Sequence, residues 1–145
     1  MSSLDELNFA SDFEAALKNP LARRSTIERG GVLEALVTLS SVNSPKEYFQ
    51  ARLAWTAYPS QPPSLKFRDP STGRLDLATS WPICRGFRPQ SLDACVNWCA
   101  EGFVLHPEWR TDPKWQWDAT GNPLFRTIQL LQFEMDEFFE GRFKQ

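Results

Sequence analysis

Residues 49–67 read FQARLAWTAYPSQPPSLKF, and the expected fold is worked out from this stretch. Apolar residues occupy every second position over 49–57, which is the period of a strand with one buried face. Three prolines then fall within positions 59–63, and they end the strand because proline cannot donate to a strand ladder. Alternation resumes over 65–67 in a second, short strand, so the stretch predicts part of an antiparallel meander.

The chain before this stretch predicts a helix and a further strand. Ser3-Leu4-Asp5-Glu6 has the form of a capping box, in which a hydroxyl and a carboxylate accept from opposing backbone amides. Apolar residues follow at loosely helical spacing: Leu4, Leu7, Phe13 and Leu17. Asn19-Pro20 ends this helix, and Gly30-Gly31 introduces a strand rich in valine and leucine over 32–39.

The chain after this stretch predicts an irregular segment and two helices. Residues 68–89 are rich in turn-forming types, with a short strand or bridge at Leu75 and Leu77. Ser91 is a candidate N-cap for a helix that continues to Phe103 on an apolar face. Asn122-Pro123, an N-cap followed by proline, begins a last helix that runs to Gly141. Helix, consecutive strands and then helices predict a single α+β domain over 1–145, with an antiparallel meander of three to four strands.

Composition narrows the function classes. The 145 residues include 16 basic and 18 acidic side chains, so we expect no nucleic-acid partner. The single histidine excludes a metal site that needs two imidazoles, and we expect no cofactor. No apolar stretch approaches the length of a bilayer span, and the first residues do not resemble a secretion signal. We therefore expect no membrane partner and a cytoplasmic protein, which agrees with an odd number of cysteines.

The order of predicted elements and the proline motif together resemble the ubiquitin-conjugating enzyme family, over roughly residues 1–105. A structural crossover motif is formed by Tyr58, Pro59, Pro62 and Pro63. Further residues that carry the resemblance are Phe67, Gly73, Leu75, Leu77, Trp81 and Pro82. The resemblance implies the ubiquitin-conjugating enzyme fold. It extends to RWD domains, which share this fold but do not carry out the conjugation reaction.

The resemblance also implies a catalytic cysteine and a nearby asparagine, and this chain departs from both. When the family pattern is aligned on Gly73, the position of its catalytic cysteine falls on Asp76. Asp69-Pro70-Ser71 then stands where the pattern has His-Pro-Asn. A carboxylate cannot replace a thiol as the acyl carrier. The chain is therefore closer to the inactive variants of the family. This implies a binding or adaptor module for a ubiquitin-like protein or its conjugation machinery, including the activating enzyme.

Two alternatives to the adaptor hypothesis stay open. Cys84 follows Trp81 in a loop expected to be partly exposed, beside Arg85 and Arg88, so it is a candidate thioester cysteine in an active noncanonical enzyme. Its other interpretation is a half-buried apolar side chain. The second alternative is a structural subunit that keeps only the fold.

The other two cysteines are interpreted as packing residues. Cys95 and Cys99 share the apolar face of the expected helix with Leu92 and Phe103, which favours burial in the core. Together with Cys84 and His106 they could supply a Cys₃His zinc site, but their spacing matches no usual zinc motif. The prediction is therefore no metal site.

The loop over 106–117 holds the remaining candidates. His106 is either a general base oriented by Glu108 or Asp112, or a residue that caps a turn or the preceding helix. Tryptophans at 109, 115 and 117 either pin the loop to the core or mark a protein-binding surface. The candidate binding residues are Trp81, Pro82, Arg85, Trp109 and Trp115.

Overall fold

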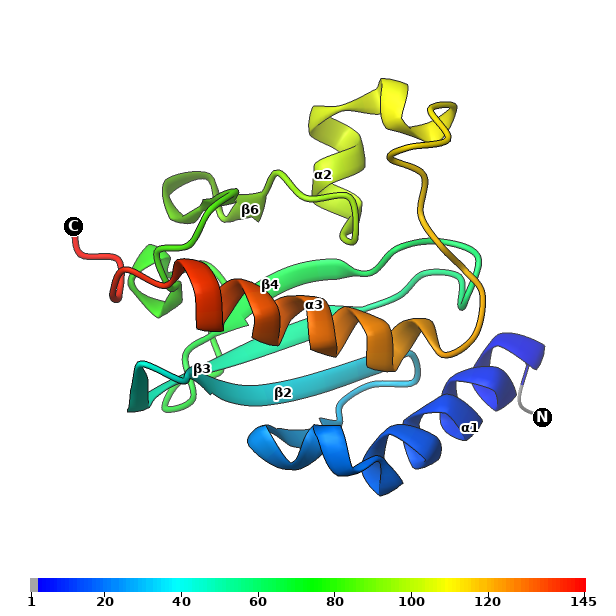
Figure 1. The fold of residues 1–145 in the computed structure, drawn as a ribbon, viewed down its shortest axis with the longest axis horizontal. Helices are drawn as coiled ribbons and strands as arrows, with labels where there is room; N and C mark the ends of the chain where they lie inside the picture. The colour runs from blue at the N-terminus through cyan, green and yellow to red at the C-terminus, as the bar shows by residue number, and fades with distance from the viewer. Residues whose placement is uncertain (1–2) are drawn as a thin grey trace.

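An antiparallel sheet forms the centre of the protein, and one long helix lies across one of its faces (Figure 1). The computed structural model describes residues 3–145, without the side chains of residues 22 and 23. The α-helices are α1 (Leu4–Lys18), α2 (Ala100–Leu105) and α3 (Pro123–Phe138). The strands are β1 (Thr26–Arg29), β2 (Glu34–Ser41), β3 (Ser44–Ala54), β4 (Ser64–Arg68), β5 (Phe87–Arg88) and β6 (Asp93–Ala94). Short 3₁₀ helices span Pro20–Arg24, Ala78–Ser80, Pro89–Ser91 and Pro107–Arg110. The α+β class is confirmed.

The main sheet is a meander in the order β1-β2-β3-β4, with every neighbouring pair antiparallel. Ala51 of β3 pairs with Val37 of β2 and with Phe67 of β4, and all three side chains are buried. The alternation predicted for 49–57 is confirmed at Phe49, Ala51, Leu53 and Trp55, which are all buried. Strand β1 is not foreseen by the sequence, because it is four residues long and buries only Ile27.

Helices α1 and α3 close the core. The buried side of α3 includes Leu124, Ile128, Leu131 and Met135, and this helix lies over the sheet against β2. Helix α1 packs against α3, and its buried residues are Phe9, Phe13 and Ala16. The three leucines of the apolar pattern predicted for α1 are instead exposed. The accessible fraction is 71% for Leu4, 58% for Leu7 and 48% for Leu17. The helix exists as predicted, but its buried face is centred on its aromatic residues.

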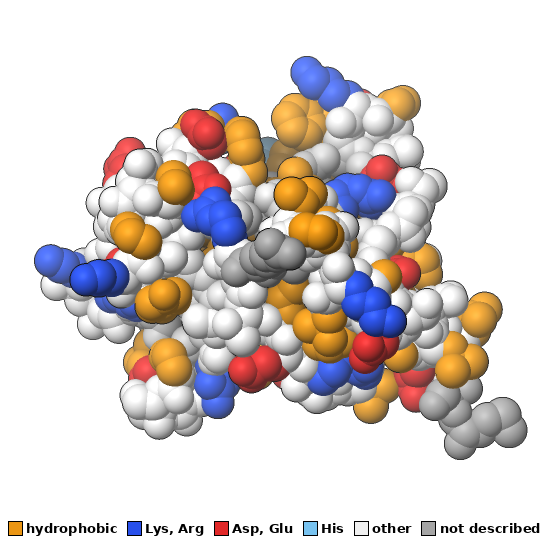
Figure 2. Space-filling model, turned by 60° about the horizontal axis from the view of Figure 1, so that its bottom comes forward, with side chains coloured by type: hydrophobic (Ala, Val, Ile, Leu, Met, Phe, Trp, Pro, Cys, Tyr) orange, Lys and Arg blue, Asp and Glu red, His pale blue; other side chains and the backbone are white. Residues whose placement is uncertain are grey.

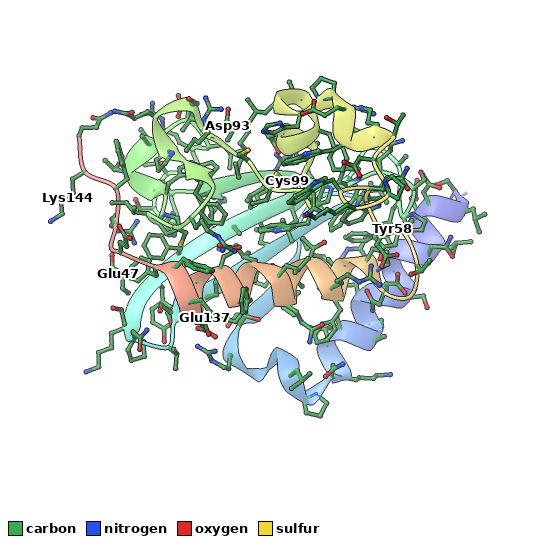
Figure 3. All side chains as sticks on the ribbon, turned by 45° about the horizontal axis from the view of Figure 1, so that its top comes forward. Glu47, Tyr58, Asp93, Cys99, Glu137 and Lys144 are labelled. Carbon is green, nitrogen blue, oxygen red and sulfur yellow. The ribbon has the colours of Figure 1, made fainter. Side chains whose placement is uncertain are left out.

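The crossover motif joins four parts of the fold. The Tyr58 hydroxyl donates to Asp12 of α1 and accepts from the backbone N–H of Leu124 in α3. Pro63 accepts, at its carbonyl, a 2.7 Å hydrogen bond from the N–H of Ala100 at the start of α2. Pro59 accepts a 2.8 Å bond from the indole N–H of Trp117. Figure 3 shows Tyr58 where α1 approaches the beginning of α3. The motif therefore positions α2 and the following loop relative to the sheet.

The helix predicted over 91–103 is wrong. Leu92 has a left-handed backbone with φ of 57°, which ends the 3₁₀ helix Pro89–Ser91 and leads into β6, so that this helix and Leu92 connect the antiparallel strands β5 and β6. The carbonyl of Leu92 accepts from Lys66 of β4, so the turn is fixed by a distant strand. Only α2 at the end of this segment is helical. Before α2 the chain forms the short strand β6 and then a turn, and this segment buries Ala94, Trp98 and Cys99, of which only Cys99 belongs to the predicted apolar face.

The short strand or bridge expected at Leu75 and Leu77 does not form. A tight turn closes instead, in which the Gly73 N–H donates to the Asp69 carbonyl at 2.7 Å and φ of Gly73 is +78°. A 3₁₀ helix begins directly afterwards at Ala78. None of the helices described between residues 3 and 145 is long and apolar enough to cross a bilayer.

Candidate functional site

Cys84 lies in the core and not in an exposed loop, so the expected exposure is wrong. Its side chain is 6% exposed, and its Sγ lies 3.7 Å from the Met135 sulfur of α3. Burial, with a further contribution from the charges of Glu134 and Glu140, raises the pKa of the Cys84 thiol to about 12. At neutral pH this thiol is protonated and shielded, which opposes its use as a nucleophile.

Trp81 and Pro82, two of the candidate binding residues, are also buried. Trp81 is fully inaccessible and packs edge-on against Phe67 and Phe87. Pro82 forms an isolated bridge with Arg142 near the C-terminus. These two residues hold the irregular segment onto the sheet, so a partner would not contact the Trp81 ring directly.

The position that the family resemblance assigns to the catalytic cysteine holds an exposed carboxylate. Asp76 Oδ1 lies 2.8 Å from Arg74 Nε, and both side chains are more than half exposed. The Arg74 guanidinium lowers the pKa of the Asp76 carboxyl. Hydrogen bonds from Thr72 and Ser71 likewise lower the pKa of Asp69, in the tripeptide that stands for His-Pro-Asn. Both carboxylates are ionised at neutral pH.

Cys95, His106 and Glu108 form a cluster that the sequence analysis did not bring together. His106 Nε2 lies 3.1 Å from Cys95 Sγ, and His106 Nδ1 lies 2.9 Å from Glu108 Oε1. The hydrogen bond to His106 lowers the pKa of the Glu108 carboxyl. Of the two partners that the sequence offered for His106, the structure places Glu108 in contact with it, whereas Asp112 accepts from the Lys114 N–H. His106 is also the C-cap of α2, as its alternative interpretation proposed.

Two tryptophans hold the imidazole ring in place. The His106 ring stacks on Trp109 with centroids 4.3 Å apart and planes 16° apart. Trp109 stacks in turn on Trp115 at 5.3 Å and 17°. Phe103 of α2 supports Trp109 from its edge. The loop over 106–117 is thus built around one aromatic stack that includes the imidazole.

Two glycines position Cys95 opposite this imidazole. A Cβ on Gly102 of α2 would lie 1.8 Å from the Val96 carbonyl oxygen, so only glycine lets the helix approach the segment that carries Cys95 so closely. Gly86 has φ of +83°, and its carbonyl accepts a 2.7 Å hydrogen bond from the Cys95 N–H. The contact between Cys95 and His106 therefore depends on tertiary packing.

A cavity of about 390 Å³ adjoins the cluster. Its lining includes Arg85, Cys95, Asn97, Trp109, Trp115 and Glu134. Glu134, on α3, is 7% exposed, and its Oε1 lies 3.2 Å from Arg85 Nη2. Its other oxygen, Oε2, is buried and has no hydrogen-bond partner among the described residues. The cavity thus combines a thiol, aromatic walls and a carboxylate with unused acceptor capacity.

A second cavity, of about 400 Å³, lies on the other side of the same loop. Its lining includes Pro62 of the crossover motif and the neighbouring Gln61, together with Phe103 and Trp117. None of the three cysteines lines it. This cavity therefore has no thiol in its lining.

The hypothetical Cys₃His group is not assembled. Cys99 is buried between α2 and the sheet (Figure 3), and burial raises the pKa of its thiol to about 12. Cys84 lies against α3, so only Cys95 contacts His106. Within residues 3–145, no three histidine, cysteine or acidic side chains are placed to hold a metal ion.

Comparison of the chain with known protein families and with curated proteins finds no match. The sequence offered Glu108 as one of two possible partners of His106 but did not combine that pair with Cys95 as a nucleophile, because the expected helix directed Cys95 into the core.

Proposed function

We propose that the protein is a binding module of ubiquitin-conjugating-like fold that recognises a ubiquitin-like protein or its conjugation machinery. The proposal combines the family resemblance of the sequence with an N-terminal helix, a four-stranded meander and a C-terminal helix in the matching order. The crossover motif that carries the resemblance lies between β3 and β4 and anchors the neighbouring helices.

The observation that carries the proposal is the exposed Arg74–Asp76 ion pair. It occupies the position at which the resemblance expects a thioester cysteine, and a carboxylate there cannot carry the acyl group. The alternative carrier, Cys84, is buried with its pKa raised to about 12. Recognition without thioester chemistry at either position is therefore favoured over the Cys84 enzyme hypothesis.

The face around the tryptophan stack is the favoured binding surface. Three of the candidate binding residues, Arg85, Trp109 and Trp115, line one cavity there. Trp115 is 37% exposed, and Lys114 lies 5.3 Å from its ring centroid. Tryptophan and arginine are the residue types that most often dominate binding energy in protein interfaces. Figure 2 brings forward a different side of the molecule, the one that carries α1, where basic and acidic side chains are interspersed among hydrophobic ones.

Surface plasmon resonance with the immobilised full chain tests the proposal. The analytes are the ubiquitin-like proteins of the source cell and their activating enzyme. We expect binding by at least one of them and a loss of about thirtyfold in affinity for Trp115→Ala, which is the smallest change typical of a hot-spot residue. Phe133→Ala, which removes another exposed aromatic ring on α3, is the matched control and should bind normally.

Two results would contradict the proposal. Absence of binding by every analyte leaves the structural-subunit hypothesis. A reductant-sensitive adduct on Cys84, formed in the presence of the activating enzyme, would replace the adaptor by the noncanonical enzyme.

A further inference from the structure

We propose that Cys95, His106 and Glu108 form a nucleophilic site that takes acyl groups from peptide-like esters or amides bound in the adjoining cavity. The inference goes beyond the proposed binding function and does not rest on it. It begins from the contacts of His106 with Cys95 at 3.1 Å and with Glu108 at 2.9 Å, which give the order nucleophile, base and orienting carboxylate.

The hydrogen-bond roles follow from the chemistry of the three groups. An ionised carboxylate only accepts, so the proton on the imidazole lies on Nδ1 and is donated to Glu108. Nε2 is then free to accept the proton of the Cys95 thiol. Transfer of that proton leaves a thiolate next to an imidazolium, an arrangement that activates cysteine nucleophiles.

The packing around the imidazole suits a positioned base. Stacking on Trp109 fixes the ring plane, and the α2 C-cap fixes its backbone, since the His106 N–H donates to the Gly102 carbonyl at 2.8 Å. Cys95 is half-buried, in contrast to the fully buried Cys84 and Cys99. It is therefore the thiol that a substrate can reach.

The cavity indicates the kind of acyl donor. Glu134 places a buried oxygen without a partner in the lining, which favours a substrate that brings an N–H donor. Arg85 and Asn97 supply donors for carbonyl oxygens, and the walls of Trp109 and Trp115 suit apolar or planar groups. Backbone amides carry this combination of donors and acceptors, so a peptide-like donor fits best.

The acyl-transfer step balances without a further reactant. The Cys95 sulfur attacks the carbonyl carbon, the S–C bond forms, and the thiol proton passes to His106 Nε2. The bond from that carbon to the leaving oxygen or nitrogen then breaks, and a leaving group that needs a proton takes it back from His106. Water or an amine releases the acyl group by the reverse sequence, with His106 again accepting and returning the proton.

p-Nitrophenyl acetate and the full chain test the inference. We expect a burst of about one p-nitrophenolate per chain and an acetyl group that peptide mass spectrometry locates on Cys95. Cys95→Ser should abolish the burst. His106→Asn should slow it by about a hundredfold, which is the lower range of a general-base contribution.

Carboxylate variants separate catalysis from folding. Glu108 is exposed, so Glu108→Gln should fold normally and still slow the burst by about tenfold, because the imidazole loses its orienting partner. Glu137→Gln, at an exposed site on α3, is the matched control and should leave the burst unchanged. Acetylation of Cys84, Cys99 or lysine in place of Cys95 would overturn the inference. A burst unaffected by both His106→Asn and Glu108→Gln would also overturn it, whatever the outcome of the partner-binding experiment.

Discussion

The phenolic hydroxyl of Tyr58 donates a hydrogen bond to the carboxylate of Asp12. The same oxygen accepts the N–H of Leu124, and Tyr58 is 1% exposed. One atom therefore joins the crossover motif to α1 and to the first turn of α3. Burial, with the hydrogen bond to Asp12 as the next contribution, raises the pKa of Tyr58, so the hydroxyl stays protonated and able to donate.

Replacing this hydroxyl should destabilise the protein. Tyr58→Phe removes one donor and one acceptor from a buried position and leaves the Leu124 N–H without its partner. We expect a loss of about 2 kcal/mol in the free energy of unfolding, measured by urea denaturation. Tyr48→Phe is the matched control, because Tyr48 is 58% exposed, and it should change stability by less than about 0.5 kcal/mol. Equal losses in the two variants would contradict the role given to Tyr58.

The Asp136 carboxylate stabilises the folded protein, and this stabilisation is lost at acid pH. Burial raises the pKa of this carboxyl, but hydrogen bonds from Arg24, the Val42 N–H and Gln132 outweigh burial and lower the pKa overall. The folded state thus binds a proton at Asp136 less tightly than the unfolded chain, in which aspartates have a pKa of about 3.9. The stabilisation is present above that pH and is lost as pH falls through the folded-state pKa.

Asp136→Asn tests this linkage. We expect a loss of about 1 kcal/mol in unfolding free energy at pH 7, a modest value because the Arg24 side chain is 44% exposed and solvent screens the pair. The difference from the unaltered protein should shrink as pH falls below about 4, because both proteins then lack the charge. Glu137→Gln, at the adjacent exposed position, should show no such convergence. A difference that stays constant down to acid pH would contradict the account.

Gly102→Ala should destabilise the protein even though alanine favours helix formation. Alanine is favoured over glycine in helices by about 1 kcal/mol, yet a Cβ here would lie 1.8 Å from the Val96 carbonyl oxygen. We expect a net loss of about 1–3 kcal/mol in denaturant unfolding, as for other overpacked sites. Alkylation of Cys95 should also slow, because the added Cβ pushes Val96 away from α2 and carries the neighbouring Cys95 away from His106. Gly31→Ala, where the nearest atom would lie 3.7 Å away, is the control, and an equal loss there would contradict the steric explanation.

Local patterns were sufficient to predict much of the fold. The alternation over 49–57 gave β3 its buried face, and the Asn122-Pro123 signal located the start of α3, where the Asn122 side chain accepts from the Phe125 N–H. The capping box at the N-terminus is half confirmed, since Ser3 accepts from the Glu6 N–H at 3.2 Å. These features depend on neighbours in the chain, so the sequence carries them directly.

The candidate site depends on distant contacts and was missed for that reason. The left-handed Leu92 is fixed by Lys66 of β4, and the approach of Cys95 to His106 depends on a glycine six residues beyond Val96. A helical pattern of apolar residues cannot report either contact. The sequence offered Glu108 or Asp112 as the partner of His106, and the structure places Glu108 there, two residues away in the chain.

Competitive alkylation of the three cysteines tests the central claim most directly. The folded protein is treated with limiting iodoacetamide at pH 7, and peptide mass spectrometry follows each thiol. The account predicts that Cys95 reacts at least about tenfold faster than Cys84 and Cys99, whose thiols are buried with pKa values raised to about 12, and that His106→Asn slows the labelling of Cys95 without changing that of the two buried thiols. Faster labelling of Cys84, or equal rates at all three cysteines in the folded protein, would contradict it.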